Sequence, residues 1–229
     1  METLYNGFTL DYPEHVFPLS TDSILLADFA HLGSHSSVLD LGAGCGTLGV
    51  LLCAKNATCQ ITGVELDETA HAAALDNIHR NGLEPRMHSI CADLRTVNTL
   101  FSPGSFSCCV SNPPYFSGGP ASVTTPLARR EDCCTPTELF AAAAWALKYG
   151  GDFYLVHKPE RLGQLCGCAV AAGLEPKRLR LIRHRADGPV SLILLACRKG
   201  GKPGLVWEET TLFDQHNQPT AYYKELYHI

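Results

Sequence analysis

Residues 37–46 read SVLDLGAGCG, a short apolar strand that runs directly into a glycine-rich turn. The turn has glycine at every second position, at Gly42, Gly44 and Gly46, and a helix is predicted over residues 47–55. Glycine tolerates positive φ angles and lets a ligand approach the backbone closely. This strand, turn and helix predict the first βα unit of an α/β fold that binds a nucleotide-like cofactor.

The rest of the chain repeats the same alternation. Further strands are predicted over residues 60–65, 88–92, 106–111, 153–157, 177–183 and 190–197. Helices are predicted over residues 22–30, 47–55, 68–81, 138–148 and 161–172. Such alternation favours a mostly parallel sheet of seven strands with helices on both faces. No helix fits between the last two strands, so they are expected to form an antiparallel hairpin around Asp187-Gly188-Pro189.

Length and composition favour one globular domain. The chain has 229 residues, 45% of them hydrophobic and 18% charged. We expect a single domain over residues 1–229, with an N-terminal segment and capping helix (1–36), a core (37–202) and a C-terminal tail (203–229). No apolar run is long enough for a membrane helix and the N-terminus lacks the pattern of a signal peptide, so a cytoplasmic protein is expected.

Cysteine is abundant, at eleven residues. Most of them lie inside apolar runs, where cysteine behaves as a small hydrophobic residue. Cys133-Cys134 and Cys166-Gly167-Cys168 lack the paired C-x2-C spacing of a zinc site. We therefore expect reduced, structural cysteines and no metal.

The net charge of −5 conceals an uneven distribution. Residues 151–202 contain ten Lys or Arg against four Asp or Glu, so this stretch carries +6 and the remainder −11. The basic residues are Lys158, Arg161, Lys177, Arg178, Arg180, Arg183, Arg185, Arg198, Lys199 and Lys202. A basic stretch of this kind favours a nucleic-acid partner. For Lys177, Arg178, Arg180 and Arg183, the alternative is the solvated face of an edge strand, where charge prevents pairing with another chain.

Acidic residues end three successive strands: Asp40, Glu65 and Asp93. Asp40 suits a cationic amino-acid group, Glu65 can accept hydrogen bonds from both ribose hydroxyls, and Asp93 can accept one from an adenine amine. S-adenosylmethionine carries these three groups. Two other interpretations remain: the acids are helix N-caps, or residues 44–49, which read GCGTLG, mark a dinucleotide dehydrogenase.

Residues 112–115 read NPPY and follow the apolar strand 106–111. Two consecutive prolines stiffen this turn and remove two backbone donors. The Asn112 side chain and the Pro113 carbonyl can accept both hydrogens of a planar NH2 group, and Tyr115 can stack on its ring. This turn, residues 112–115 with Pro114 as its second proline, therefore suits a planar amine substrate. The alternative is a stiff structural loop with a buried tyrosine.

Together, the glycine turn, the three acids and NPPY resemble a class I S-adenosylmethionine-dependent methyltransferase with a Rossmann-like sheet. Residues 17–26, 128–131, 157–162 and 174–180 further resemble bacterial tRNA adenine-N6 methyltransferases that modify the adenine beside the anticodon of a valine tRNA, in particular their Gram-positive-type members. The resemblance implies that Thr21 and Asp22 lie near the methionine end of the cofactor. It also implies that Asn112 borders the cofactor and holds the target amine.

For a tRNA substrate, the adenine must leave its stack, and Tyr115 or Phe116 is then expected to receive it. Arg129, Arg130, Lys158 and Arg161 are expected to contact phosphates, with Lys177, Arg178 and Arg180 as further candidates. The protein is expected to be a monomer or weak dimer.

Several other functions remain open. Glutamine-N5 methyltransferases of peptide-release factors share NPPY, but they usually carry a larger N-terminal domain and a Glu where this chain has Asp22. Ribosomal-RNA guanine-N2 methylation and DNA adenine-N6 methylation are further alternatives. A cofactor-binding protein without catalysis is disfavoured because Asn112 and the three acids are all present.

Overall fold

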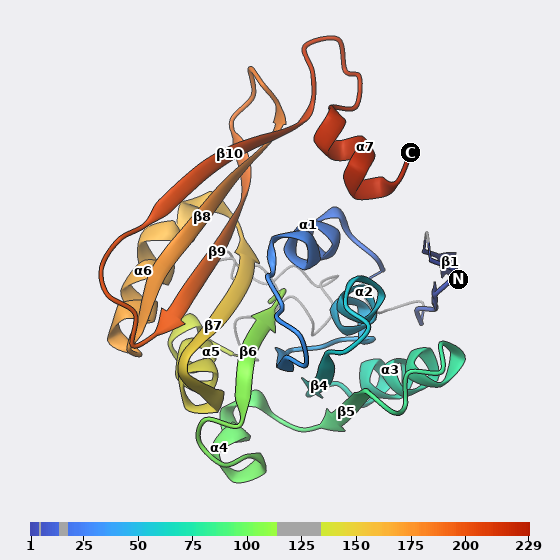
Figure 1. Cartoon of the computed structure of the whole chain (residues 1–229), viewed down its shortest axis with the longest axis vertical. Helices are drawn as coiled ribbons and strands as arrows, with labels where there is room; N and C mark the ends of the chain where they lie inside the picture. Colours follow the sequence, from blue (N-terminus) through green and yellow to red (C-terminus); the bar gives the residue numbers. More distant parts are fainter. Residues whose placement is uncertain (5, 14–17, 114–133) are drawn as a thin grey trace, which may run out of the picture.

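The computed structural model describes residues 1–4, 6–13, 18–113 and 134–229. Its strands are β1 (Glu2–Thr3), β2 (Thr9–Leu10), β3 (Ser37–Leu41), β4 (Gln60–Glu65), β5 (Met87–Cys91), β6 (Phe106–Ser111), β7 (Leu147–His157), β8 (Leu174–Arg185), β9 (Val190–Lys199) and β10 (Val206–Phe213). Within these described residues, eight strands form one sheet in the order β10-β8-β9-β7-β6-β3-β4-β5 (Figure 1). The first two strands pair as a separate short antiparallel ribbon.

Helices cover both faces of the sheet. They are α1 (Thr21–Phe29), α2 (Thr47–Lys55), α3 (Glu68–Arg80), α4 (Val97–Leu100), α5 (Pro136–Ala146), α6 (Leu162–Ala171) and α7 (Ala221–Tyr227). Side chains of α1, α2 and α3, such as Leu25, Leu52 and Ile78, belong to one buried cluster. Side chains of α4, α5 and α6, such as Phe140 and Leu165, belong to a second. Central strands are therefore buried on both sides, which explains their nearly continuous apolar sequences.

Local sequence accounts for where the main helices begin. The Ser20 side chain caps α1 by accepting a hydrogen bond from the Ser23 amide, and Asp67 caps α3 in the same way from Ala70. Thr135 and Glu138 form a capping box at the start of α5, with Pro136 in its first turn. Each cap satisfies amide groups that have no partner inside the helix.

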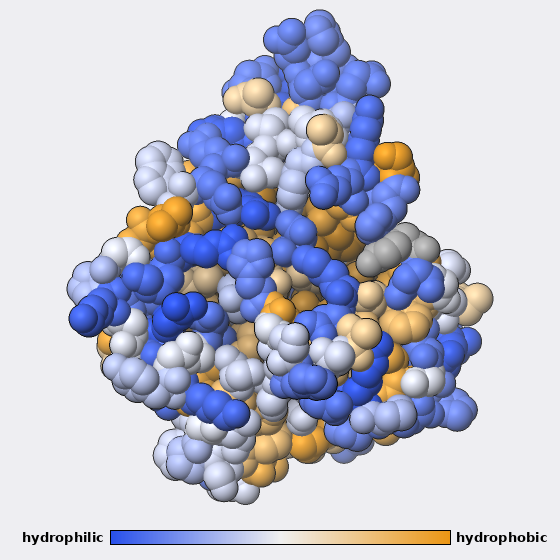
Figure 2. All heavy atoms as spheres, in the orientation of Figure 1, coloured by the Kyte–Doolittle hydropathy of each residue, from blue (hydrophilic) through white to orange (hydrophobic). Residues whose placement is uncertain are grey.

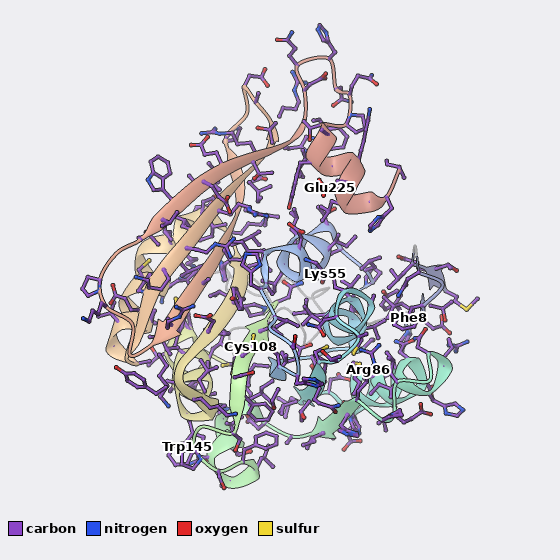
Figure 3. The ribbon with its side chains drawn as sticks, viewed as in Figure 1. Phe8, Lys55, Arg86, Cys108, Trp145 and Glu225 are labelled. Carbon is purple, nitrogen blue, oxygen red and sulfur yellow. The ribbon has the colours of Figure 1, made fainter. Side chains whose placement is uncertain are left out.

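Lys55 links α2 to α1, two helices on the same face of the sheet. It is the last residue of α2, and its Nζ donates hydrogen bonds to the carbonyl oxygens of Ala27 and Asp28, each at 3.0 Å (Figure 3). These carbonyls lie in the last turn of α1, where a cation is favourable. The contact fixes α1 against α2.

The parallel part of the sheet determines where a ligand can bind. Strands β7, β6, β3, β4 and β5 are parallel to one another. From β3 the chain first continues to β4 and β5, and later returns to the other side of β3 with β6. The helices that follow β3 and β6, α2 and α5, pack on opposite faces of the sheet, and open α/β sheets bind ligands at such a point.

The predicted α/β class and antiparallel hairpin are confirmed, since β8 pairs with β9 in antiparallel register. The count of seven strands was wrong, because β10 lies in the expected C-terminal tail and pairs with β8 in parallel (Figure 1). After β9 the chain passes the start of β8 through residues 200–205, where Gly200 has a φ of 66° and Gly204 a φ of 136°. Strand β8 is therefore an internal strand, and the edge-strand interpretation of its arginines was also wrong.

Candidate active site

Asp40 is the most unusual side chain at this end of the sheet. It lies on β3, is 1% exposed, and its Oδ2 has no hydrogen-bond partner among the described residues. Burial, aided by the negative charge of Glu65, raises the pKa of Asp40 to about 7. A buried carboxylate without a partner is costly, and a cationic ligand group would satisfy it.

The glycine turn exposes the backbone next to Asp40. Gly42 has a φ of 76° and Gly44 a φ of 55°, and a Cβ atom at either position would meet no heavy atom of the described residues within 4 Å. A ligand can therefore approach these two residues directly. Gly46 differs, because a Cβ atom there would lie 2.9 Å from Met87 Cε. Gly46 is the N-cap residue of α2, with a φ of 76°, and its missing side chain lets Met87 pack against the backbone. Its predicted direct contact with the cofactor therefore has less support.

Glu65 is oriented by two backbone amides. Its Oε2 accepts a hydrogen bond from Gly44 N at 2.7 Å, and its Oε1 accepts one from Asp67 N at 2.8 Å. Each carboxylate oxygen has a second lone pair, so Glu65 can still accept two hydroxyl donors. The helix-cap interpretation does not apply to Glu65, because Asp67 caps α3.

Asp93 has a structural role in this conformation. It caps the short 3-10 helix Leu94–Thr96 and accepts hydrogen bonds from the Arg95 amide at 2.9 Å and the Arg95 Nε at 2.8 Å. The Arg95 hydrogen bonds keep the pKa of Asp93 below its usual value. The N-cap interpretation is therefore confirmed for this acid. Its contact with an adenine amine stays a prediction, and Arg95 would compete with that amine.

Asn112 follows β6, across the switch point from Asp40. Its Nδ2 donates a hydrogen bond to Ser23 Oγ on α1 at 2.9 Å. Within the described part of the chain, its Oδ1 accepts none. Pro113 is buried beside it. The other residues predicted around this turn, Pro114, Tyr115, Phe116, Arg129 and Arg130, lie outside the described residues.

The first turn of α1 lies against the C-terminal helix. Thr21 Oγ1 is 3.0 Å from Tyr227 Oη of α7. Burial raises the pKa of Asp22, while the positive charge of Lys158 opposes this shift. The structure thus brings the N-terminus of α1 together with the residue that follows β7. Ser23 and Tyr227 were not predicted: Ser23 gave a weak signal, as a polar residue within an apolar helix, and Tyr227 lies in the tail.

Arg180 lies inside an ion-pair network and does not present its guanidinium to solvent. Its side chain is 13% exposed; its Nη1 lies 3.0 Å from Asp28 Oδ2 and its Nε 2.8 Å from Glu208 Oε1. It also donates to Tyr222 Oη at 3.1 Å. These bonds join β8, β10, α1 and α7. The phosphate contact of Arg180 stays a prediction with weaker support, because its guanidinium already has these partners.

Two neighbouring basic residues are also engaged. Arg178 stacks over the Phe29 ring at 4.4 Å, and Lys177 Nζ donates to the Lys202 carbonyl at 2.9 Å. Their roles as phosphate contacts remain predictions with weaker support. Figure 2 shows that hydrophilic side chains nevertheless dominate the face of the molecule in view. Two other predicted phosphate contacts lie at the ligand-binding edge of the sheet. Lys158 is exposed just after β7, and Arg161 follows it and donates a hydrogen bond to Gln164 Oε1 at 2.9 Å.

The described residues provide no cluster of three or more His, Cys, Asp or Glu side chains that could hold a metal ion. No helix in these residues is long and apolar enough to cross a membrane. The ten described cysteines are free thiols.

The donor set fits S-adenosylmethionine. Asp40 offers a cation its buried Oδ2, which has no partner among the described residues. Glu65 is held with lone pairs to spare for a diol, and the backbone at Gly42 and Gly44 is accessible. A pyrophosphate would instead meet two carboxylates at this position, which disfavours the dehydrogenase alternative.

Comparison with known proteins agrees with this site. Residues 20–163 match the family model of the methyltransferase small domain. A tRNA1(Val) (adenine(37)-N6)-methyltransferase of Tolumonas auensis is 32% identical over 199 residues, which cover 85% of this chain and 82% of that protein. A protein of the same name from Bacteroides fragilis is 27% identical over 195 residues, 84% of this chain and 81% of that protein.

Solved structures support the fold. A protein described as a predicted O-methyltransferase from Agrobacterium tumefaciens superposes with a TM-score of 0.77 at 18% identity, over 91% of this chain and 96% of that one. The geranyl diphosphate C-methyltransferase of Streptomyces coelicolor, solved with S-adenosyl-L-homocysteine, has a TM-score of 0.56 at 13% identity, over 77% of this chain and 78% of that one. The chain therefore belongs to the methyltransferase small-domain family, in the branch that contains the tRNA1(Val) adenine-N6 methyltransferases.

Proposed function

We propose that this protein transfers the methyl group of S-adenosylmethionine to N6 of an adenine in tRNA, the one beside the anticodon. The observation that carries the proposal is the position of Asn112. Its amide is held by Ser23 through Nδ2. Within the described part of the chain this leaves Oδ1 available at the switch point, where Asp40 Oδ2 also has no partner. The names of the relatives from Tolumonas auensis and Bacteroides fragilis support tRNA as the substrate.

When bound, S-adenosylmethionine supplies an electrophilic methyl group attached to a sulfonium. In this proposal Asp40 compensates the positive charge of its amino-acid part, and Glu65 binds its ribose hydroxyls. Gly42 and Gly44 allow the backbone to lie against it. Thr21 and Asp22 border the same end of the site.

Asn112 and Pro113 act on the substrate. The lone pair of adenine N6 is delocalised into the ring, which makes the amine a poor nucleophile. Asn112 Oδ1 and the Pro113 carbonyl oxygen each accept a hydrogen bond from one N–H of the amine. This favours a pyramidal nitrogen and directs its lone pair toward the methyl group. Positioning and electrostatic stabilisation then account for most of the acceleration. Tyr115 or Phe116 would receive the unstacked base, while Arg129, Arg130, Lys158 and Arg161 would bind phosphates.

The test is methylation of an unmodified tRNA transcript by the purified protein, followed by mass spectrometry of its nucleosides. N6-methyladenosine is the expected product. Asn112→Ala is expected to reduce transfer at least about 100-fold while the Kd for S-adenosylmethionine changes little. Absence of methyl transfer to tRNA, together with methylation of a release-factor glutamine, would instead support the glutamine-N5 alternative.

A further inference from the structure

The first turn of α1 holds the amide group of Asn112. Ser23 lies in this turn, is 6% exposed, and accepts the hydrogen bond from Asn112 Nδ2 at 2.9 Å. The two residues are 89 positions apart in the sequence. We propose that Ser23 is a positioning residue that fixes which end of the Asn112 amide faces the substrate, an inference that rests on the proposed role of Asn112.

The orientation of this amide determines whether the site can accept an amine. The two ends of an asparagine amide have nearly the same shape, but the oxygen accepts hydrogen bonds and the nitrogen donates them. An amino group presents two donors, so it is bound by Oδ1 and repelled by Nδ2. Because Nδ2 is engaged by Ser23, Oδ1 is the end that remains for the substrate.

The hydroxyl group of Ser23 is placed to act as an acceptor. Ser20 Oγ lies 3.4 Å from Ser23 Oγ, and it also accepts the Ser23 amide N–H at 3.3 Å. Ser20 Oγ thus provides an acceptor for the hydroxyl proton of Ser23, which leaves a lone pair of Ser23 for Asn112 Nδ2. Ser20, Ser23 and Asn112 form a short chain in which the helix cap sets the orientation of the amide.

No other described residue restrains the Asn112 amide, because the bond to Ser23 is its one side-chain hydrogen bond within the described ranges. Ser23→Ala therefore frees the amide to rotate by 180° and to present Nδ2 to the substrate. Loss of one restraining hydrogen bond is expected to lower kcat about 5- to 10-fold. The Kd for S-adenosylmethionine is expected to stay within about twofold, since Ser23 acts on the amide that binds the amine.

Ser36→Ala is the matched control. Ser36 is 9% exposed, and its Oγ donates a hydrogen bond to the Gly33 carbonyl at 2.9 Å. It precedes β3 and so lies at the end of the sheet away from Asn112. The substitution removes a buried serine hydroxyl of the same kind, and kcat is expected to remain at the wild-type value. Ser23→Thr keeps the hydroxyl and is expected to recover most of the activity lost in Ser23→Ala.

Two measurements decide the proposal. The first is kcat for tRNA methylation, where a wild-type value in Ser23→Ala overturns it. The second is the side-chain NH2 signal of Asn112 in a ¹⁵N NMR spectrum, assigned by its loss in Asn112→Asp. This signal is expected to shift or broaden in Ser23→Ala but not in Ser36→Ala, and an unchanged signal in Ser23→Ala also overturns the proposal.

The NMR measurement needs no substrate, so it separates this inference from the proposed function. A wild-type protein that methylates no tRNA refutes the proposed function, while the Asn112 signal still tests Ser23. If Ser23→Ala does not fold, Ser23→Cys provides the same comparison. Sulfur is a weaker acceptor than oxygen, so the kcat of this variant is expected to lie about 2- to 5-fold below that of wild type; a wild-type kcat with an unshifted Asn112 signal overturns the proposal.

Discussion

Replacing Asp40 by asparagine tests the electrostatics of the cofactor site. Burial and the charge of Glu65 raise the pKa of Asp40 from 3.8 to about 7 in the ligand-free protein. At 1.36 kcal/mol for each pH unit of difference in pKa, the higher pKa corresponds to about 4 kcal/mol of folding free energy. The folded protein holds this proton more tightly than the unfolded chain, so protonation of Asp40 stabilises the folded state. That stabilisation is complete below about pH 4 and is lost as the pH rises through about 7.

The amide introduced by Asp40→Asn does not titrate, so the difference in unfolding free energy between variant and wild type must depend on pH. Between pH 5 and pH 8 the difference is expected to shift by about 3 kcal/mol in favour of the variant. Urea unfolding of the ligand-free proteins at both pH values measures this shift. Asp76→Asn, which changes an exposed carboxyl on α3, is the control and should give nearly the same difference at both pH values.

Binding of S-adenosylmethionine should reverse the preference of Asp40. A cationic ligand favours the ionised carboxylate, so binding near pH 6 should release close to one proton from wild type and none from Asp40→Asn. Calorimetry in two buffers of different ionisation enthalpy measures the released proton. The variant should also bind at least about 100-fold more weakly, since a buried charge pair is lost. A pH-independent stability difference combined with no proton release would refute the reasoning.

Three further variants test other parts of the structure. Glu65→Gln turns one end of the side chain into a donor that faces the amides of Gly44 and Asp67. The Kd for S-adenosylmethionine, measured by calorimetry, should therefore rise at least about tenfold. Glu68→Gln, at an exposed position, is the control, and equal affinities of the two variants would contradict the role of Glu65. Arg180→Met removes the most buried cation of the network around Asp28 and Glu208 and should lower the urea-unfolding free energy by about 2–3 kcal/mol. The more exposed pair broken in Arg198→Met should cost less than about 1 kcal/mol; similar losses in both would argue against the network. Lys158→Ala with Arg161→Ala should weaken tRNA binding and reduce the slope of log K against log salt by about 2, while Arg198→Ala should not; an unchanged slope would remove these residues from the RNA interface.

Most of the local structure could be predicted from the sequence. The strand 37–41, the glycine turn and the helix 47–55 agree with the structure residue by residue, because apolar runs, glycines and caps act over a few neighbouring residues. The C-terminal strand β10 was missed because its first four residues are exposed and its sequence, VWEETTLF, lacks a buried face there. That omission led to the edge-strand interpretation of the arginines of β8, which the pairing of β10 with β8 contradicts.

Short-range patterns in the sequence predict the kind of site: a glycine turn, acids at three strand ends and an amide-proline turn, in an order that resembles a methyltransferase. The contacts of each side chain become visible in the folded arrangement of the chain. It buried Asp40 with an Oδ2 that has no partner among the described residues, paired Arg180 with Asp28 and Glu208, and placed Ser23 against Asn112 from 89 residues away. Burial, charge pairing and hydrogen bonding depend on which segments meet in space, and a local sequence pattern does not contain that information.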